Sequence, residues 1–364
     1  MKTIDLFNLY IDESRPDVPW SEYKIGSLTV RLTDDYNDKV SLLPQPPMWT
    51  LNETGLQRSP AQKGTWQATA TVSWKGAGEK SILLDKVADD GGLWDLCNLL
   101  TFMTGRIVVT EKYQERYRPD IYGDCYAVVP IETLPAAALA WQNRECLVSK
   151  NLHIALHLYN EAMNANLLQS RAALYCTALN IILDQHEMVY EKVSKPIRKK
   201  LKNEISDLLT KKTELQPDHE ERYKNLLHGQ IDRGPSLLEK LFSLLQSLEI
   251  IDPSPTPEQK TRVQYVDRVR NVLMHTGRIP ELKGLDDEQA ERYTVNIAAN
   301  VVPELIRIVI GHHLGFRADD FGVYCQIKDD TINFFQNGVF REHRFAEICE
   351  QVLKKNSELY QRLS

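Results

Sequence analysis

Residues 257–280 read PEQKTRVQYVDRVRNVLMHTGRIP, and this stretch predicts one amphipathic helix. Its apolar side chains recur at helical spacing and form a single arc, which consists of Val263, Val266, Val269 and Leu273. Pro257 suits a first helical turn, and Gly277 followed by Pro280 is typical of a helix end. The pattern therefore predicts a helix over residues 257–276 that packs its apolar arc against other helices.

Three polar residues near the end of this helix carry the candidate chemistry. Arg270 falls inside the apolar arc, where a guanidinium needs a paired acceptor, and Asn271 and His275 stand on the neighbouring flank. Arg offers two parallel donors to a phosphate, and His exchanges protons near neutral pH, so this set of groups can cut RNA without a metal. An ideal helix separates Arg270 and His275 by about 140°, so they converge only through the long Arg side chain or a distortion at the helix end.

The same three residues also have a purely structural interpretation. A cation that extends along an apolar face to solvent, and an imidazole that caps a helix end, would occupy the positions of Arg270 and His275 equally well. Spacing alone does not separate this interpretation from a catalytic one.

The order Arg270, Asn271, three residues, His275, within RVRNVLMHTG, resembles the signature of the HEPN superfamily, and is most similar to its ApeA-like group. A second segment, residues 171–184, is similar to the early HEPN helix that precedes the motif helix. The resemblance covers about residues 151–315. One departure is that many members carry an acidic residue where this chain has Asn180, which leaves Asp184 as a substitute.

This resemblance implies a helical, metal-independent endoribonuclease, of the kind found in bacterial toxins and antiviral defence effectors. In such an enzyme the ribose 2′-hydroxyl attacks the adjacent phosphate and leaves a 2′,3′-cyclic phosphate. His275 would transfer protons, Arg270 would stabilise charge on the phosphoryl oxygens, and Asn271 would orient the imidazole or bind substrate. The resemblance further implies a homodimer through the helical domain, and a protein or phage-derived trigger is a possible partner.

Composition limits the classes of protein to which this chain can belong. Its 364 residues are enough for two domains, and its net charge of −6 argues against a protein that coats nucleic acid. No apolar run approaches the ~20 residues of a membrane span, and the N-terminus lacks the apolar core of a signal peptide. We therefore expect a cytoplasmic protein with no membrane segment. The six cysteines form no CxxC pair and the nine histidines form no HExxH motif, so we expect no metal and no cofactor.

Because the chain as a whole is acidic, we expect any contact with RNA to be limited to small basic patches. Two basic stretches are candidates: residues 112–118, where Lys112, Arg116 and Arg118 alternate with tyrosines, and residues 195–202, which include Lys199 and Lys200. Interleaved aromatic and basic side chains can stack bases and hold phosphates. The alternative is that both stretches are ordinary solvated surfaces.

The chain as a whole predicts an α+β protein in three parts. Residues 1–150 form a β-rich domain with a recognition or regulatory role, residues 151–315 an all-helical HEPN-like domain, and residues 316–364 a small hairpin and helix. In the first part, residues 23–33, 65–74 and 106–111 are predicted strands, and a helix lies between Asp90 and Gly105, with Trp94 and Asp95 as packing and surface residues. The predicted helices of the second part span residues 151–167, 169–190, 196–212, 218–231, 235–249, 257–276 and 286–314. In the third part, the Asn-Gly pair at 337–338 predicts a hairpin over residues 332–340, before a helix over 344–363.

Two rival functions remain open on the sequence. One is a catalytically inert HEPN module that binds a partner, nucleotide or RNA as part of a larger assembly, and the other is a structural subunit. Intact Arg270, Asn271 and His275 favour the enzyme, because a binding-only domain has no chemical need for all three.

Overall fold

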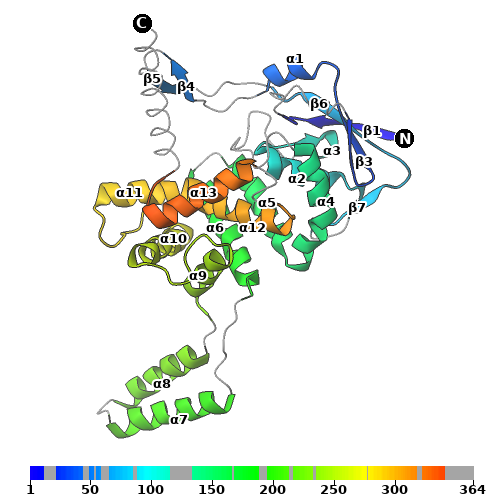
Figure 1. Cartoon of the computed structure of the whole chain (residues 1–364). Coiled ribbons are helices and arrows are strands. Elements are labelled where there is room, and N and C mark those ends of the chain that lie inside the picture. The colour runs from blue at the N-terminus through cyan, green and yellow to red at the C-terminus, as the bar shows by residue number, and fades with distance from the viewer. Residues whose placement is uncertain are drawn as a thin grey trace.

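The structure is a computed structural model. It describes residues 1–11, 22–43, 49–52, 55–58, 65–84, 88–114, 133–165, 168–187, 195–212, 216–232, 235–276, 278–317 and 322–340. Within these ranges the chain has an N-terminal antiparallel sheet followed by many helices, which confirms the α+β class (Figure 1).

The N-terminal sheet has five strands in the order β2-β3-β6-β1-β9. Their bounds are β1 Lys2–Phe7, β2 Glu22–Ile25, β3 Leu28–Leu32, β6 Ala68–Trp74 and β9 Val109–Thr110. The single strand expected over residues 23–33 is wrong, because the chain turns at Gly26, whose φ is 57°, and β2 pairs with β3 as a hairpin. The alternation of apolar and polar residues breaks at Gly26-Ser27, between Ile25 and Leu28, and this two-residue turn is the signal that the expectation of one strand overlooked. The strand expected over 106–111 is shortened to β9.

Short elements surround this sheet. The helices are α1 Tyr36–Ser41 and α3 Glu111–Gln114, and two further strand pairs are β4 Trp49–Asn52 with β5 Gly55–Arg58 and β7 Glu79–Ser81 with β8 Ala88–Gly91. The predicted helix after Asp90 is present as α2, Leu93–Thr104, and all twelve of its residues are buried. Asp90, in β8, accepts hydrogen bonds from the backbone N–H groups of Gly92 and Trp94 at 2.9 Å each, so its carboxylate binds the first turn of α2.

The helices after residue 150 agree closely with the expected ranges. They are α5 Leu152–Asn164, α6 Leu168–Gln185, α7 Lys195–Lys212, α8 Pro217–Asp232, α9 Leu237–Ser247, α10 Pro257–Thr276, α11 Asp287–Asn296 and α12 Val302–His313, with a π-helical turn at Ile297–Val301 between the last two. Among the described residues, the run Asp287–His313 is long and apolar enough to cross a membrane, but 78% of its apolar window is buried inside the protein, as in an ordinary core helix. Figure 1 shows α7 and α8 beside each other and apart from the other helices.

The hairpin expected over residues 332–340 is wrong. Residues Gly322–Asn337 form a helix, α13, because the buried side chains Ile327, Phe334 and Phe335 recur at helical rather than strand spacing. Gly338 adopts a φ of 70° and its N–H donates to the carbonyl of Phe334 at 2.9 Å, so the Asn-Gly pair ends a helix instead of turning a hairpin. The helix expected over residues 344–363 lies outside the described residues.

The apolar core continues across the boundary expected at residue 150. One cluster of buried side chains extends from Leu6 in the sheet to Phe340 after α13. Helix α4, Thr133–Ser149, packs against both α2 and α5, and Asn160 of α5 donates to Asn98 of α2 at 3.0 Å. The β-rich and helical parts are therefore joined by a shared core.

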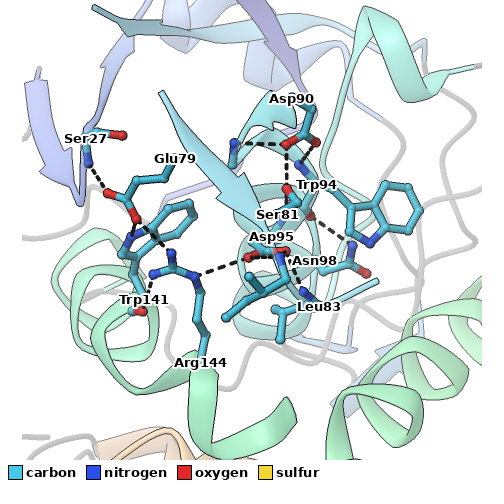
Figure 2. Close-up of polar contacts among 12 residues, drawn as sticks. Ser27, Glu79, Ser81, Leu83, Asp90, Trp94, Asp95, Asn98, Trp141 and Arg144 are labelled. Atoms are coloured by element: carbon cyan, nitrogen blue, oxygen red, sulfur yellow. Dashed lines mark hydrogen bonds and ion pairs between the residues drawn. The ribbon is translucent and has the colours of Figure 1, made fainter. Parts of the chain in front are cut away.

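A buried polar network ties β7, β8, α2 and α4 together (Figure 2). Asp95, expected at the surface, is fully buried: it accepts from the backbone N–H groups of Ile82 and Leu83 at 2.9 Å each and lies 3.2 Å from Nε of Arg144. Arg144 also donates to Glu79 at 2.7 Å. Burial raises the pKa of the Asp95 carboxyl to about 6, although these hydrogen bonds and the charge of Arg144 oppose the rise.

Candidate functional site

Helices α10 and α6 position the three motif residues. The apolar arc of α10 is buried as expected, since Val263, Val266 and Val269 have no exposed surface, and α10 packs on α6. Arg270 lies on the same face and is 1% exposed, so its charge is almost fully removed from solvent. A buried guanidinium requires hydrogen-bond acceptors around it.

The structure supplies these acceptors from both helices. Nη1 of Arg270 donates to the side-chain oxygen of Asn180 on α6. Nη2 donates to Oδ1 of Asp267, at 2.5 Å, and to Oδ1 of Asn271, at 3.1 Å. Nε is buried and has no hydrogen-bond partner among the described residues. The guanidinium is therefore held by one amide from α6 and by a carboxylate and an amide from its own helix.

Asp267 belongs to this cluster although the sequence pattern did not single it out. Its second oxygen accepts from the Asn271 side chain at 3.4 Å, so one carboxylate binds both motif residues. Asp267 stands three residues before Arg270 and four residues before Asn271. Side chains at these separations meet on a helix, so this spacing could have identified Asp267 from the sequence. Asp184, the expected acidic substitute on α6, instead receives a hydrogen bond from Lys240 of α9 at 2.9 Å. The acid of the site therefore comes from α10 itself.

Two neighbouring side chains complete the surroundings of the cluster. The Asn180 amide donates to the sulfur of Met274 at 3.0 Å, which holds its oxygen towards Arg270. Cys176 lies one turn earlier on α6, and burial raises the pKa of its thiol to about 12, opposed by the nearby charge of Arg270. The thiol is thus a packing group and not a nucleophile at neutral pH.

His275 is not part of this hydrogen-bonded cluster. It lies in the last turn of α10, is exposed, and makes no hydrogen bond with any residue that the structure describes. Asn271 stands one turn before it and is half-buried. The structure therefore brings Arg270 and Asn271 together but leaves the imidazole free at the surface. Gly277, the expected helix-end glycine, lies outside the described residues.

The expected RNA-binding residues are scattered. Lys199 and Lys200 are exposed on α7, and Nζ of Lys200 lies 3.9 Å from Glu204. Lys112 is exposed on α3, with its ammonium 5.4 Å from the ring centre of Tyr113. That ring is buried and its hydroxyl donates to Asp90 at 2.5 Å, so it cannot stack on a base. Arg116 and Arg118 lie outside the described residues.

Two further features of the described residues bear on the chemistry available here. Among the described residues, no group of three or more His, Cys, Asp or Glu side chains is arranged to hold a metal ion. A surface hollow of about 710 Å³ beside α10 is lined by Arg268 and by residues between 279 and 291, and none of the three motif residues lines it. Within the described residues, the motif consists of the exposed His275 at the helix end and the buried polar cluster around Arg270.

No protein-family model, curated protein or solved structure matches this chain.

Proposed function

We propose that the protein is a metal-independent endoribonuclease of the HEPN type, acting as a toxin or antiviral defence effector in the cytoplasm. The observation that supports it best is the arrangement at the end of α10, where an exposed imidazole follows a rigid cluster of Arg270, Asn271 and Asp267 by one helical turn. A catalytic imidazole must reach solvent and substrate, whereas the groups that orient substrate gain from being held in place.

The proposed reaction needs no oxidant and no cofactor. The ribose 2′-oxygen bonds to phosphorus, the bond from phosphorus to the 5′-oxygen breaks, and the products are a 2′,3′-cyclic phosphate and a 5′-hydroxyl. His275 moves the proton taken from the 2′-hydroxyl or given to the leaving oxygen. Asn271, half-buried between Arg270 and solvent, offers its amide to the substrate or to the imidazole.

The role of Arg270 differs from that of a surface phosphate clamp. At 1% exposure its guanidinium is already bonded to three side chains, so in a single chain it acts on substrate through Asn271 and through its charge. Direct contact with a phosphate requires Asn180 or Asp267 to release it. Because each chain offers one His275, a two-fold homodimer through the helical domain would supply the second imidazole for the acid and base steps.

The burial of Arg270 also favours a second candidate function. In this alternative the protein is a catalytically inert HEPN module that binds a protein, a nucleotide or RNA within a larger assembly. An Arg270 that only braces α10 against α6 would have the contacts seen here. Whether the protein is an enzyme or an inert module, its N-terminal part, which includes Lys112, is the candidate surface that a trigger would bind. Lys199 and Lys200 on α7 are the candidate RNA contacts.

One assay separates the two candidates. Purified protein is incubated with a long single-stranded RNA in EDTA, in parallel with His275→Gln, which keeps a polar side chain of similar reach at an exposed position. The enzyme proposal expects cleavage by the parent and a loss of about 100-fold or more in the variant. Cleavage by neither protein supports the inert module, and equal cleavage by both would exclude His275 as the group that transfers protons.

A further inference from the structure

The α7–α8 hairpin has no hydrophobic core of its own. Every residue whose burial is described in α7 and α8, 196–211 and 217–228, is exposed or half-exposed. Isolated helices of this length are marginal in water, and an apolar face that the two helices do not bury between them must pack against another element. Five of the ten exposed large hydrophobic side chains of the described protein lie here: Ile197, Leu201, Leu208, Tyr223 and Leu226.

Polar contacts between the two helices show how they face each other. Ser206 lies 3.1 Å from Nε2 of His228, and the Thr210 hydroxyl donates to Glu220 at 2.6 Å and accepts from Lys224 at 2.9 Å. The contacts pair the end of α7 with the beginning of α8, so the helices run antiparallel. They form a polar seam along one side of the hairpin.

The exposed apolar side chains gather on the other side. At about 100° per residue, Ile197, Leu201 and Leu208 lie within about 40° of one another on α7, and Tyr223 and Leu226 within about 60° on α8. The half-buried positions 198, 202, 205, 206 and 209 mark the side of α7 that faces α8, and positions 220, 224, 227 and 228 mark the side of α8 that faces α7. The apolar residues lie about 110° from these facing sides, in the same rotational sense on both helices. Because the helices are antiparallel, both groups point to one side. We call these five residues the apolar face.

We propose that the apolar face pairs with the same face of a second copy of this chain, giving an antiparallel four-helix bundle. The charge pattern supports this partner. The sequence of α7 has seven basic and two acidic residues, whereas that of α8 has two basic and four acidic. A two-fold axis parallel to the helices places α7 of one copy against α8 of the other, so that opposite charges meet. A nucleic acid would be repelled by α8.

The size of the face sets the strength of the pairing. Helices of 18 and 16 residues present a surface about 25 Å long and about 20 Å wide. That is about 500 Å² on each copy and about 1,000 Å² for the pair, at the low end of specific interfaces. The expected dimer is therefore one that dissociates on dilution. This inference is independent of nuclease activity, because association is measured without RNA.

Sedimentation equilibrium of the full chain tests the pairing. The double substitution Leu208→Glu/Leu226→Glu places carboxylates in the apolar face and should weaken association by about tenfold or more. The matched control is Asn203→Glu/Asn225→Glu, which adds the same charge at exposed positions beyond the polar seam and should dimerise like the parent. Leu208→Lys/Leu226→Lys should also be monomeric, and a mixture of the Lys and Glu proteins should recover the dimer.

Three outcomes would overturn the proposal. The parent could remain a monomer at about 100 µM, a concentration at which an interface of this area should associate. The Glu variant could associate as tightly as the parent. Finally, the Glu variant could lose RNA binding with no change in association state, which would assign the face to RNA. Circular dichroism on each variant checks that the helices are retained.

Discussion

Replacing Arg270 with Ala should destabilise the protein far more than replacing His275, although both belong to one motif. Arg270 is 1% exposed and is bonded to Asn180, Asp267 and Asn271, whereas His275 is exposed and has no hydrogen bond with a described residue. Removal of one partner from a buried ion pair costs about 3–5 kcal/mol. The Asp267 side chain remains 20% exposed and partly solvated, so about 3 kcal/mol is expected.

Thermal melts followed by circular dichroism measure this difference. At about 1.3 °C per kcal/mol for a chain of this length with one shared core, Arg270→Ala should lower the Tm by about 4 °C, whereas His275→Ala should stay within about 0.5 kcal/mol of the parent. Arg268→Ala is the matched control, because Arg268 is an exposed arginine on the same helix. A melting temperature for Arg270→Ala within about 1 °C of the parent would refute the conclusion that Arg270 holds α10 to α6.

Three further outcomes are expected. Asp267→Asn keeps the shape of the cluster but removes its charge, so it should lower stability by about 1–3 kcal/mol and lower kcat for RNA cleavage without raising KM; an unchanged kcat would contradict the positioning role of Asp267. The pKa of Asp95 in the folded protein, about 6, lies above its usual value of 3.8. The stabilisation that the protonated Asp95 carboxyl gives the folded state is therefore fully present below pH 3.8 and is lost as the pH rises through 6. Relative to Asp95→Asn, the parent should therefore lose about 2 kcal/mol of unfolding free energy between pH 4 and pH 7 in urea titrations, and parallel curves would reject this. Cleavage should change by less than about twofold in EDTA, and rescue by added Mg²⁺ of a lost activity would exclude the metal-independent mechanism.

The helices were predictable because their signals are local. Pro257 and the arc of Val263, Val266 and Val269 are enough to place α10, and the structure begins and ends that helix at the expected residues. The hairpin at 332–340 failed for the opposite reason. An Asn-Gly pair favours positive φ at a hairpin turn and at a helix end alike, and only the burial of Phe334 and Phe335 on one helical face decides between them.

The candidate site was predictable only in part. Arg270 and Asn271 stood out because a cation on an apolar arc demands a partner, and Asn180 was noted at the position that now contacts Arg270. Asp267 was missed because an acidic residue between apolar positions is usually solvated. Asp95 was expected at the surface for the same reason, and its burial depends on Arg144 and on two backbone N–H groups that meet it only in three dimensions.

The most direct test of the central claim uses a short RNA that contains one mapped cleavage site. The same oligonucleotide is prepared with a single 2′-deoxy sugar on the 5′ side of the scissile phosphate, and both are incubated with the protein in EDTA. If the motif at the end of α10 activates the 2′-hydroxyl, the all-RNA substrate is cut to a 2′,3′-cyclic phosphate and the deoxy substrate is not cut at that site. Cleavage of the deoxy substrate at the same position, or products that carry a 5′-phosphate, would contradict it.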